Sequence, residues 1–122
     1  MTGLTRDNPT IIAFVLNCYL SNAISTEELQ MWAADVAGSG VAHPDYIMDL
    51  ITFDAPRFHI YETLGFSPGR TFSAHECEAI QGLAYLRNRL VFEASNKARA
   101  LQALHQNPSV GAEFAAIYVH PA

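Results

Sequence analysis

Cysteine is scarce in this sequence: among its 122 residues, only Cys18 and Cys77 are cysteines. Two cysteines are too few for a disulfide framework, and no C-x-x-C spacing or neighbouring ligand pair indicates structural zinc. A chain of this length can bury about two-thirds of its unfolded surface in one domain, so it needs neither a metal nor a disulfide for stability. We expect a single domain over residues 1–122, with both thiols reduced and buried.

Long apolar runs are also lacking. The run from Ile11 to Leu20 is broken by Asn17 and falls far short of the roughly 20 residues that a membrane span requires. The first residues lack the basic start and the small-residue cleavage site of a signal peptide. We therefore expect a cytoplasmic protein that does not bind membranes.

Catalytic and cofactor-binding motifs are missing as well. The chain contains no P-loop, no G-x-G-x-x-G and no G-x-S-x-G. His59 with Glu62, and His75 with Glu78, have the i, i+3 spacing that places two groups on one helical face, but the further ligands that metal motifs need are absent. We expect no catalytic activity, no cofactor and no metal. An enzyme would require His59 or His75 to meet carboxylates from distant helices.

Basic residues are few in the first half of the chain. Residues 1–54 contain seven acids and one base, Arg6, for a charge of −6, whereas the remainder contains five acids and six bases, for +1. Because phosphate binding needs clustered lysine and arginine, the first half should repel nucleic acid and attract a basic protein. Four bases between residues 87 and 99 allow a weak nucleic-acid patch or a solvated helix face with i, i+4 ion pairs. Nearby acids favour the solvated face.

The clearest feature that is present is a helix over residues 25–37. Ser25 and Glu28 form a capping box, in which each side chain satisfies a backbone donor of the first turn. Apolar residues then recur at i, i+3, i+4 and i+7, which gives the helix one buried face. Gly38 is expected to end the helix with a positive φ. Stability alone explains these features, so we assign this helix to the scaffold.

Two more helices are indicated by their start and stop residues. Asn8 is expected to cap a helix that begins at Pro9 and turns back through a short connection into the helix of residues 25–37. Asp54 is expected to cap a short helix that ends at Gly65. The side chains that this short helix should bury are Phe58, Tyr61 and Leu64.

Residues 74–106 fit either one long helix or two. A second capping box, Ser73 with Glu76, starts this region, and Ser95-Asn96 favours a break with a new cap. A last helix is expected over 110–119. No alternating strand pattern or internal repeat is visible, so the sequence predicts an all-α single-domain bundle of six or seven mostly short helices.

Carboxylates recur through the middle of the first half. The series is Asp35, Asp45, Asp49 and Asp54, with Tyr46 among them. Asp45 and Asp54 stand where helices begin, and the helix dipole favours acids there. Asp35 and Asp49 fall late in their helices, where negative charge is mildly unfavourable. The series is therefore either ordinary surface or a binding face for a basic partner.

Two motifs lie within this region. The first is ISTEEL at residues 24–29 followed by WAAD at residues 32–35, and the second is PDYIMDL at residues 44–50. Over about residues 19 to 65 they resemble the small all-helical immunity proteins of bacterial contact-dependent growth inhibition and polymorphic toxin systems. Those proteins often carry an I-S-x-E-E-x-x-x-W-A-[DE] helix followed by a P-x-[YW]-[IL]-x-[DE]-L helix.

This resemblance implies a cytoplasmic inhibitor that binds and neutralises one cognate toxin domain, commonly a basic nuclease. The residues that would contact the toxin are Asp35, Asp45, Tyr46, Asp49 and Asp54. A helical adaptor or self-associating scaffold without catalytic activity stays open as the alternative. A stable homodimer through the first helix would favour that alternative.

Overall fold

All regular structure in the protein is helical. The computed structural model describes residues 3–91 and 96–117, and within these ranges it contains seven α-helices, one short 3-10 helix and no strand. The predicted all-α bundle of six or seven mostly short helices is confirmed. The elements are α1 (Thr10–Leu20), α2 (Thr26–Gly38), α3 (Tyr46–Ile51), η1 (Arg57–His59), α4 (Ile60–Leu64), α5 (Ala74–Leu86), α6 (Lys97–Gln106) and α7 (Pro108–Ile117).

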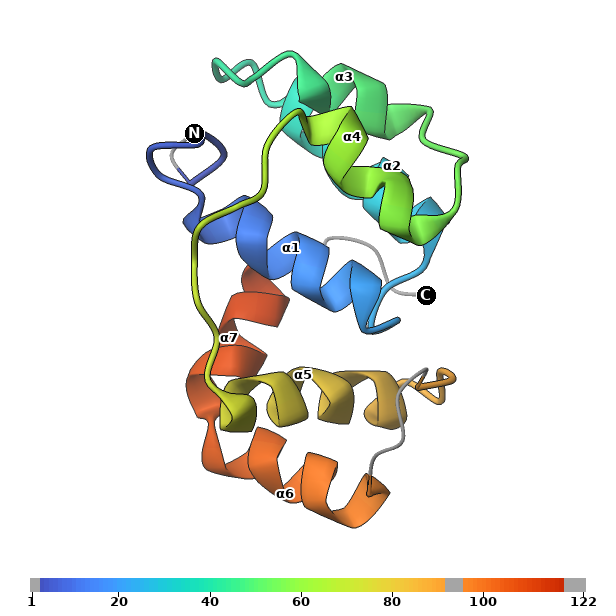
Figure 1. Ribbon diagram of the computed structural model, residues 1–122, viewed down its shortest axis with the longest axis vertical. Helices are drawn as coiled ribbons and strands as arrows, with labels where there is room; N and C mark the ends of the chain where they lie inside the picture. Colours follow the sequence, from blue (N-terminus) through green and yellow to red (C-terminus); the bar gives the residue numbers. More distant parts are fainter. Residues whose placement is uncertain (1–2, 92–95, 118–122) are drawn as a thin grey trace.

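Helix α1 lies between two groups of helices. The helices α2, α3 and α4 lie on one side of it, and α5, α6 and α7 on the other (Figure 1). Seven of the eleven residues of α1 are buried. Leu50 and Ile60 from the first group share one buried cluster with Ile80 and Val110 from the second, so a single core extends through both groups.

Both predicted capping boxes are present. Ser25 Oγ accepts from the Glu28 backbone N–H at 3.1 Å, and Glu28 Oε1 accepts from the Ser25 N–H at 3.0 Å. Ser73 and Glu76 make the same pair of bonds at the start of α5, at 3.0 and 2.9 Å. These bonds satisfy backbone donors that a helix start otherwise leaves without a partner.

Three of the predicted helix ends are wrong. Helix α1 begins at Thr10, and the side chain of Asn8 accepts from the Thr10 hydroxyl instead of capping the helix. Gly38 is the last residue of α2, and the positive φ, 77°, falls at Gly40. Asp54 caps no helix, because the next helical turn, η1, begins only at Arg57, after the extended Pro56. The predicted helix end at Gly65 is confirmed, and Gly65 adopts a left-handed conformation with a φ of 82°.

Residues 74–106 form two helices, as favoured. Helix α5 ends at Leu86, and Asn96 starts α6 by accepting from the Arg99 backbone N–H at 3.1 Å. The two helices pack closely at Gly82, where a Cβ atom would overlap the carbonyl oxygen of Ala100. Helix α7 begins at Pro108, two residues before the predicted 110, and the predicted residues 118–119 lie outside the described ones.

The turn between α1 and α2 joins the two groups of helices. Its Asn22, 6% exposed and with a φ of 63°, accepts at Oδ1 from Arg57 at 2.8 Å and from Arg89 at 2.7 Å. Its Nδ2 donates to the Leu90 carbonyl at 2.6 Å. These bonds attach both the segment after α5 and the start of η1 to the buried side chain of Asn22.

Arg87 also joins the two groups of helices, through bonds to the α1–α2 turn and to α2. Its guanidinium donates to both carboxylate oxygens of Glu28, at 3.1 and 2.5 Å, and also to the carbonyl of Ala23. The prediction that Arg87 and Arg89 lie on a solvated helix face is therefore wrong. Both point into the interface between the two helix groups and bind the α1–α2 turn.

Candidate partner-binding face

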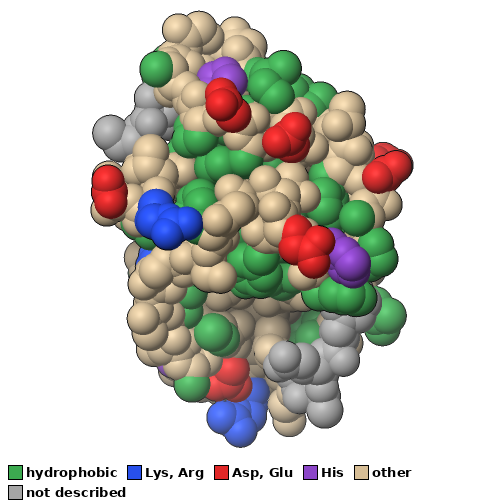
Figure 2. Space-filling view, turned by 45° about the horizontal axis from the view of Figure 1, so that its top comes forward, with side chains coloured by type: hydrophobic (Ala, Val, Ile, Leu, Met, Phe, Trp, Pro, Cys, Tyr) green, Lys and Arg blue, Asp and Glu red, His purple; other side chains and the backbone are tan. Residues whose placement is uncertain are grey.

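Four exposed carboxylates gather around α3 and α4. Asp45, Asp49, Asp54 and Glu62 are all exposed, and we call the surface that they share with the exposed side chains between them the acidic face. The space-filling view shows acidic side chains spread over this end of the molecule, with apolar side chains between them and little basic surface (Figure 2). The one base of residues 41–64, Arg57, turns its guanidinium inward to Asn22 and the Tyr19 ring. Carboxylates therefore outnumber bases on the acidic face, where the exposed Arg6 lies near Asp45 and Asp49.

Large apolar side chains are exposed on α3, η1 and α4, and one of them, Tyr61, lines the second pocket described below. Phe58 is 73% exposed, Met48 55% and Tyr61 39%. The prediction that Phe58 and Tyr61 are buried is wrong because the chain enters this region through η1 instead of a regular helix. Arg57 takes the inward position there, and Ile60 with Leu64 forms the buried side of α4. Exposed aromatic and methionine side chains among charges are typical of protein-binding surfaces.

The predicted site residues do not all lie together. Asp45 and Asp49 are exposed and one helical turn apart at α3, where both line a groove described below. Asp49 lies in the first turn of α3, so the prediction that it falls late in its helix is wrong, and the helix dipole favours an acid there. Asp54 is exposed just beyond the end of α3, and Asp35 is half-buried on α2, and neither lines this groove. Tyr46 is only 6% exposed and lies beneath the carboxylates. Its hydroxyl donates to the Leu4 carbonyl, and burial raises the pKa of this phenol.

The groove between α3 and the N-terminal segment has a volume of about 430 Å³, and we call it the α3 groove. Asp45 and Asp49 line one wall, and Arg6 lines another. Tyr46 and Phe66 meet edge to face at the groove, with ring centroids 5.9 Å apart. The groove therefore offers carboxylates above an aromatic floor, which suits a cationic group that also carries an apolar stem.

Sequence patterns did not point to Arg6, Phe66 or Phe58. Arg6 and Phe66 are 60 residues apart and meet only because the N-terminal segment packs on the loop after α4. Phe58 could have been recognised only by noticing that Pro56 delays the helix start, which changes the phase of the buried positions.

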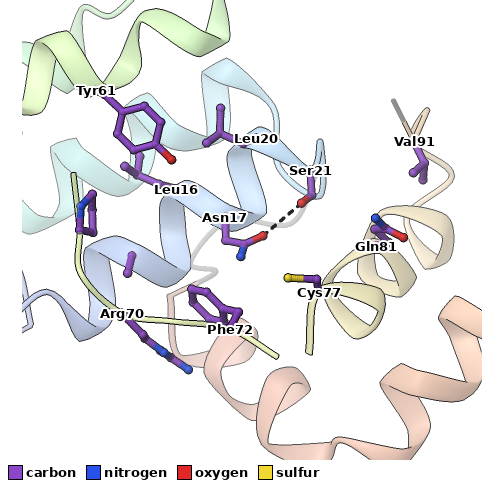
Figure 3. A pocket seen from close by; sticks show the side chains of 12 residues that line it. Leu16, Asn17, Leu20, Ser21, Tyr61, Arg70, Phe72, Cys77, Gln81 and Val91 are labelled. Atoms are coloured by element: carbon purple, nitrogen blue, oxygen red, sulfur yellow. Dashed lines mark hydrogen bonds between the residues drawn. The ribbon is translucent and has the colours of Figure 1, made fainter. Parts of the chain in front are cut away.

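A second pocket, of about 330 Å³, lies where α1 and α5 meet the loop after α4 (Figure 3). Its polar lining includes Asn17, Gln81, the Cys77 thiol and one charged group, Arg70. Arg70 donates to both carboxylate oxygens of Glu113, at 2.7 and 2.8 Å, and these bonds raise its pKa. The charge of this pocket is thus already paired within the chain, whereas the carboxylates of the α3 groove face solvent.

Two of the histidines make contacts with nearby side chains. His59 lies 3.7 Å from Glu62 on the surface, and a ring nitrogen of His75 is hydrogen-bonded to Asn107 at 2.9 Å. Cys18 is buried, which raises the pKa of its thiol. Cys77 is half-buried, so the prediction that both thiols are buried is wrong for Cys77. Among the described residues, no group of three or more histidine, cysteine, aspartate or glutamate side chains is placed to hold a metal ion. No helix in the described ranges is long and apolar enough to cross a bilayer.

Comparisons of the chain with known protein families, with curated proteins and with solved structures find no match.

Proposed function

We propose that this chain is an immunity protein, which binds a basic toxin domain through the acidic face and neutralises it. The observation that carries the proposal is the composition of that face. It combines exposed carboxylates with the exposed side chains of Phe58 and Met48 on one end of the molecule. The resemblance of residues 19–65 to helical immunity proteins supplies the class of partner.

The two kinds of side chain would serve different steps of binding. Clustered carboxylates attract a basic partner over several ångströms and raise the association rate. Exposed aromatic and methionine side chains then give the desolvated contacts that slow dissociation. If the toxin is a nuclease, the carboxylates occupy the positions that nucleic-acid phosphates would otherwise take.

Internal pairing of the arginines supports a protein partner over nucleic acid. Arg57, Arg70, Arg87 and Arg89 all donate to groups of this chain, so their guanidinium groups serve the fold. Exposed bases on α6 are Lys97 and Arg99, and Arg99 lies 3.5 Å from Glu78. Nucleic-acid binding by phosphate contacts needs a larger basic cluster than these two residues provide.

Self-association through the first helix is less favoured. Seven residues of α1 are buried by the rest of the chain, including Phe14 and Tyr19. A dimer that used α1 would have to expose this core surface. The acidic face, in contrast, would repel a second copy of itself.

The test is neutralisation of a toxin domain encoded in a neighbouring reading frame. We expect wild-type chain to restore growth of cells that express the toxin domain and to co-purify with it. Asp45→Lys/Asp49→Lys should abolish both effects. The control Glu27→Lys/Gln102→Lys/Gln106→Lys raises the net charge by the same amount on exposed positions of α2 and α6 and should keep both.

Equal protection by the two variants would contradict the proposal, because charge at the acidic face would then be irrelevant. Formation of a stable homodimer together with absence of toxin binding would favour the scaffold alternative.

A further inference from the structure

The floor of the α3 groove is buried and mostly apolar. Leu4 and Leu64, which are 0% and 7% exposed, lie beneath it beside Tyr46. The Tyr46 hydroxyl is bonded to the Leu4 carbonyl, which holds the N-terminal segment against α3. The groove thus exists before any partner binds, and a side chain that enters it does not have to open it.

The walls of the groove carry charge of both signs. Asp45 and Asp49 are exposed on one wall at i, i+4 spacing, which places their Cβ atoms about 5–6 Å apart. Arg6 also lines the groove, and its guanidinium carbon lies 5.5 Å from the centre of the Phe66 ring. Arg6 also donates to the Gly65 carbonyl at 3.2 Å. The chain's own arginine therefore stacks on an aromatic ring of this groove.

We infer that the α3 groove receives an arginine side chain of the basic partner, with its guanidinium between Asp45 and Asp49 and its stem on Tyr46 and Leu64. This inference rests on the proposed function and names the group that the acidic face recognises. Two carboxylates one turn apart can accept from both edges of a planar guanidinium, which a lysine ammonium cannot match. The aromatic floor adds a contact that favours the flat cation.

Arg6 should weaken the binding of a cation in the α3 groove. It carries the same charge as the incoming arginine and lines the same groove. Its positive charge opposes entry of a second cation, so removing it should strengthen binding. Arg99 carries the same charge on α6, so a gain from removing Arg6 that removal of Arg99 does not reproduce distinguishes a local cation site from the overall negative field.

The experiment titrates the full chain with N-ethylguanidinium and, separately, with ethylammonium, and follows backbone amide chemical shifts. We expect saturable shifts confined to groove residues such as Thr5 and Thr63, with weaker binding of ethylammonium. Asp45→Asn/Asp49→Asn should weaken N-ethylguanidinium binding about tenfold, because two charges are lost from the site. Arg6→Gln should strengthen it about threefold. Arg99→Gln removes the same charge from α6 and should leave it unchanged.

Scattered shifts, equal binding of the two cations, or an affinity that neither Asp45→Asn/Asp49→Asn nor Arg6→Gln alters would overturn the inference. Binding of the toxin domain is measured in parallel with Phe58→Ala. If the toxin domain binds through Phe58 while N-ethylguanidinium does not bind in the groove, the inference fails and the proposed function stands. If N-ethylguanidinium binds in the groove and no toxin domain binds, the groove is supported as a guanidinium site and the proposed function fails.

Discussion

Replacing Arg87 by methionine should test how strongly the two groups of helices are joined. The Arg87 and Glu28 side chains are only 13% and 11% exposed, and the variant would leave the Glu28 carboxylate without this guanidinium. It would also remove the donor to the Ala23 carbonyl. Methionine keeps much of the apolar stem, so the loss comes mainly from the charged hydrogen bonds.

The expected cost follows from this burial. Breaking a buried ion pair by removing one partner costs about 3–5 kcal/mol. Glu28 still accepts from the Ser25 backbone N–H at 3.0 Å, so we expect a value near the lower end, about 3 kcal/mol. The unfolding entropy of a 122-residue chain is about 0.26 kcal/mol/K, so the melting temperature should fall by about 12 °C.

Thermal unfolding followed by circular dichroism, and urea unfolding followed by the fluorescence of Trp32, measure this change. The control is Arg99→Met, because the Arg99–Glu78 pair is 71% and 32% exposed and should be worth less than about 0.5 kcal/mol. In a double-mutant cycle with Glu28→Gln, the coupling energy should be about 2 kcal/mol. A loss below about 1 kcal/mol for Arg87→Met, or simple additivity in the cycle, would refute this reasoning.

Three further predictions concern packing, pH and binding. Gly82→Ala should destabilise the fold by about 1–3 kcal/mol in urea unfolding, because its Cβ would overlap the Ala100 carbonyl. In Gly111→Ala the new Cβ meets open space in α7, so this variant should stabilise the fold by about 0.5–1 kcal/mol. If both glycine variants change the free energy of unfolding in the same direction, the close packing at Gly82 is contradicted. The Ser73 N–H bond lowers the pKa of Glu76, so the folded state gains stability above the ordinary glutamate pKa of 4.5 and loses it as pH falls through the lower, folded-state pKa. Glu76→Gln should therefore reduce the fall in melting temperature between about pH 5.5 and pH 3. An unchanged slope would show that the Glu76 carboxylate does not contribute to this pH dependence. Phe58→Ser should change stability by less than about 0.5 kcal/mol and weaken toxin-domain binding about tenfold or more in calorimetry; the reverse pattern would assign Phe58 to the core.

The sequence predicted the parts of the fold that depend on neighbouring residues. Both capping boxes join residues three positions apart, and Asn96 caps α6 through the backbone N–H of Arg99, which is also three positions away. Such bonds follow from the side-chain types and their spacing alone. The all-helical class follows in the same way from local apolar periodicity.

Contacts across the chain could not be predicted in this way. Arg87 is 59 residues from Glu28, and Arg89 is 67 from Asn22, so the sequence offers no local sign that these arginines point inward. The candidate site shows the same limit. Asp49 was identified as a charge that the helix dipole did not explain and Asp45 as an acid at a helix start, whereas the place of Arg6 depends on how the N-terminal segment packs.

The most direct test of the proposed function is the association rate of the chain with its toxin domain as a function of salt. We expect Asp45→Asn/Asp49→Asn to lower the rate constant on the order of tenfold at low ionic strength and to flatten its salt dependence. The matched control Gln102→Lys/Gln106→Lys changes the net charge equally and should have a small effect, because these exposed residues lie on α6, away from the acidic face. If both variants slow association to the same extent, net charge alone guides the encounter and the acidic face is not the binding site.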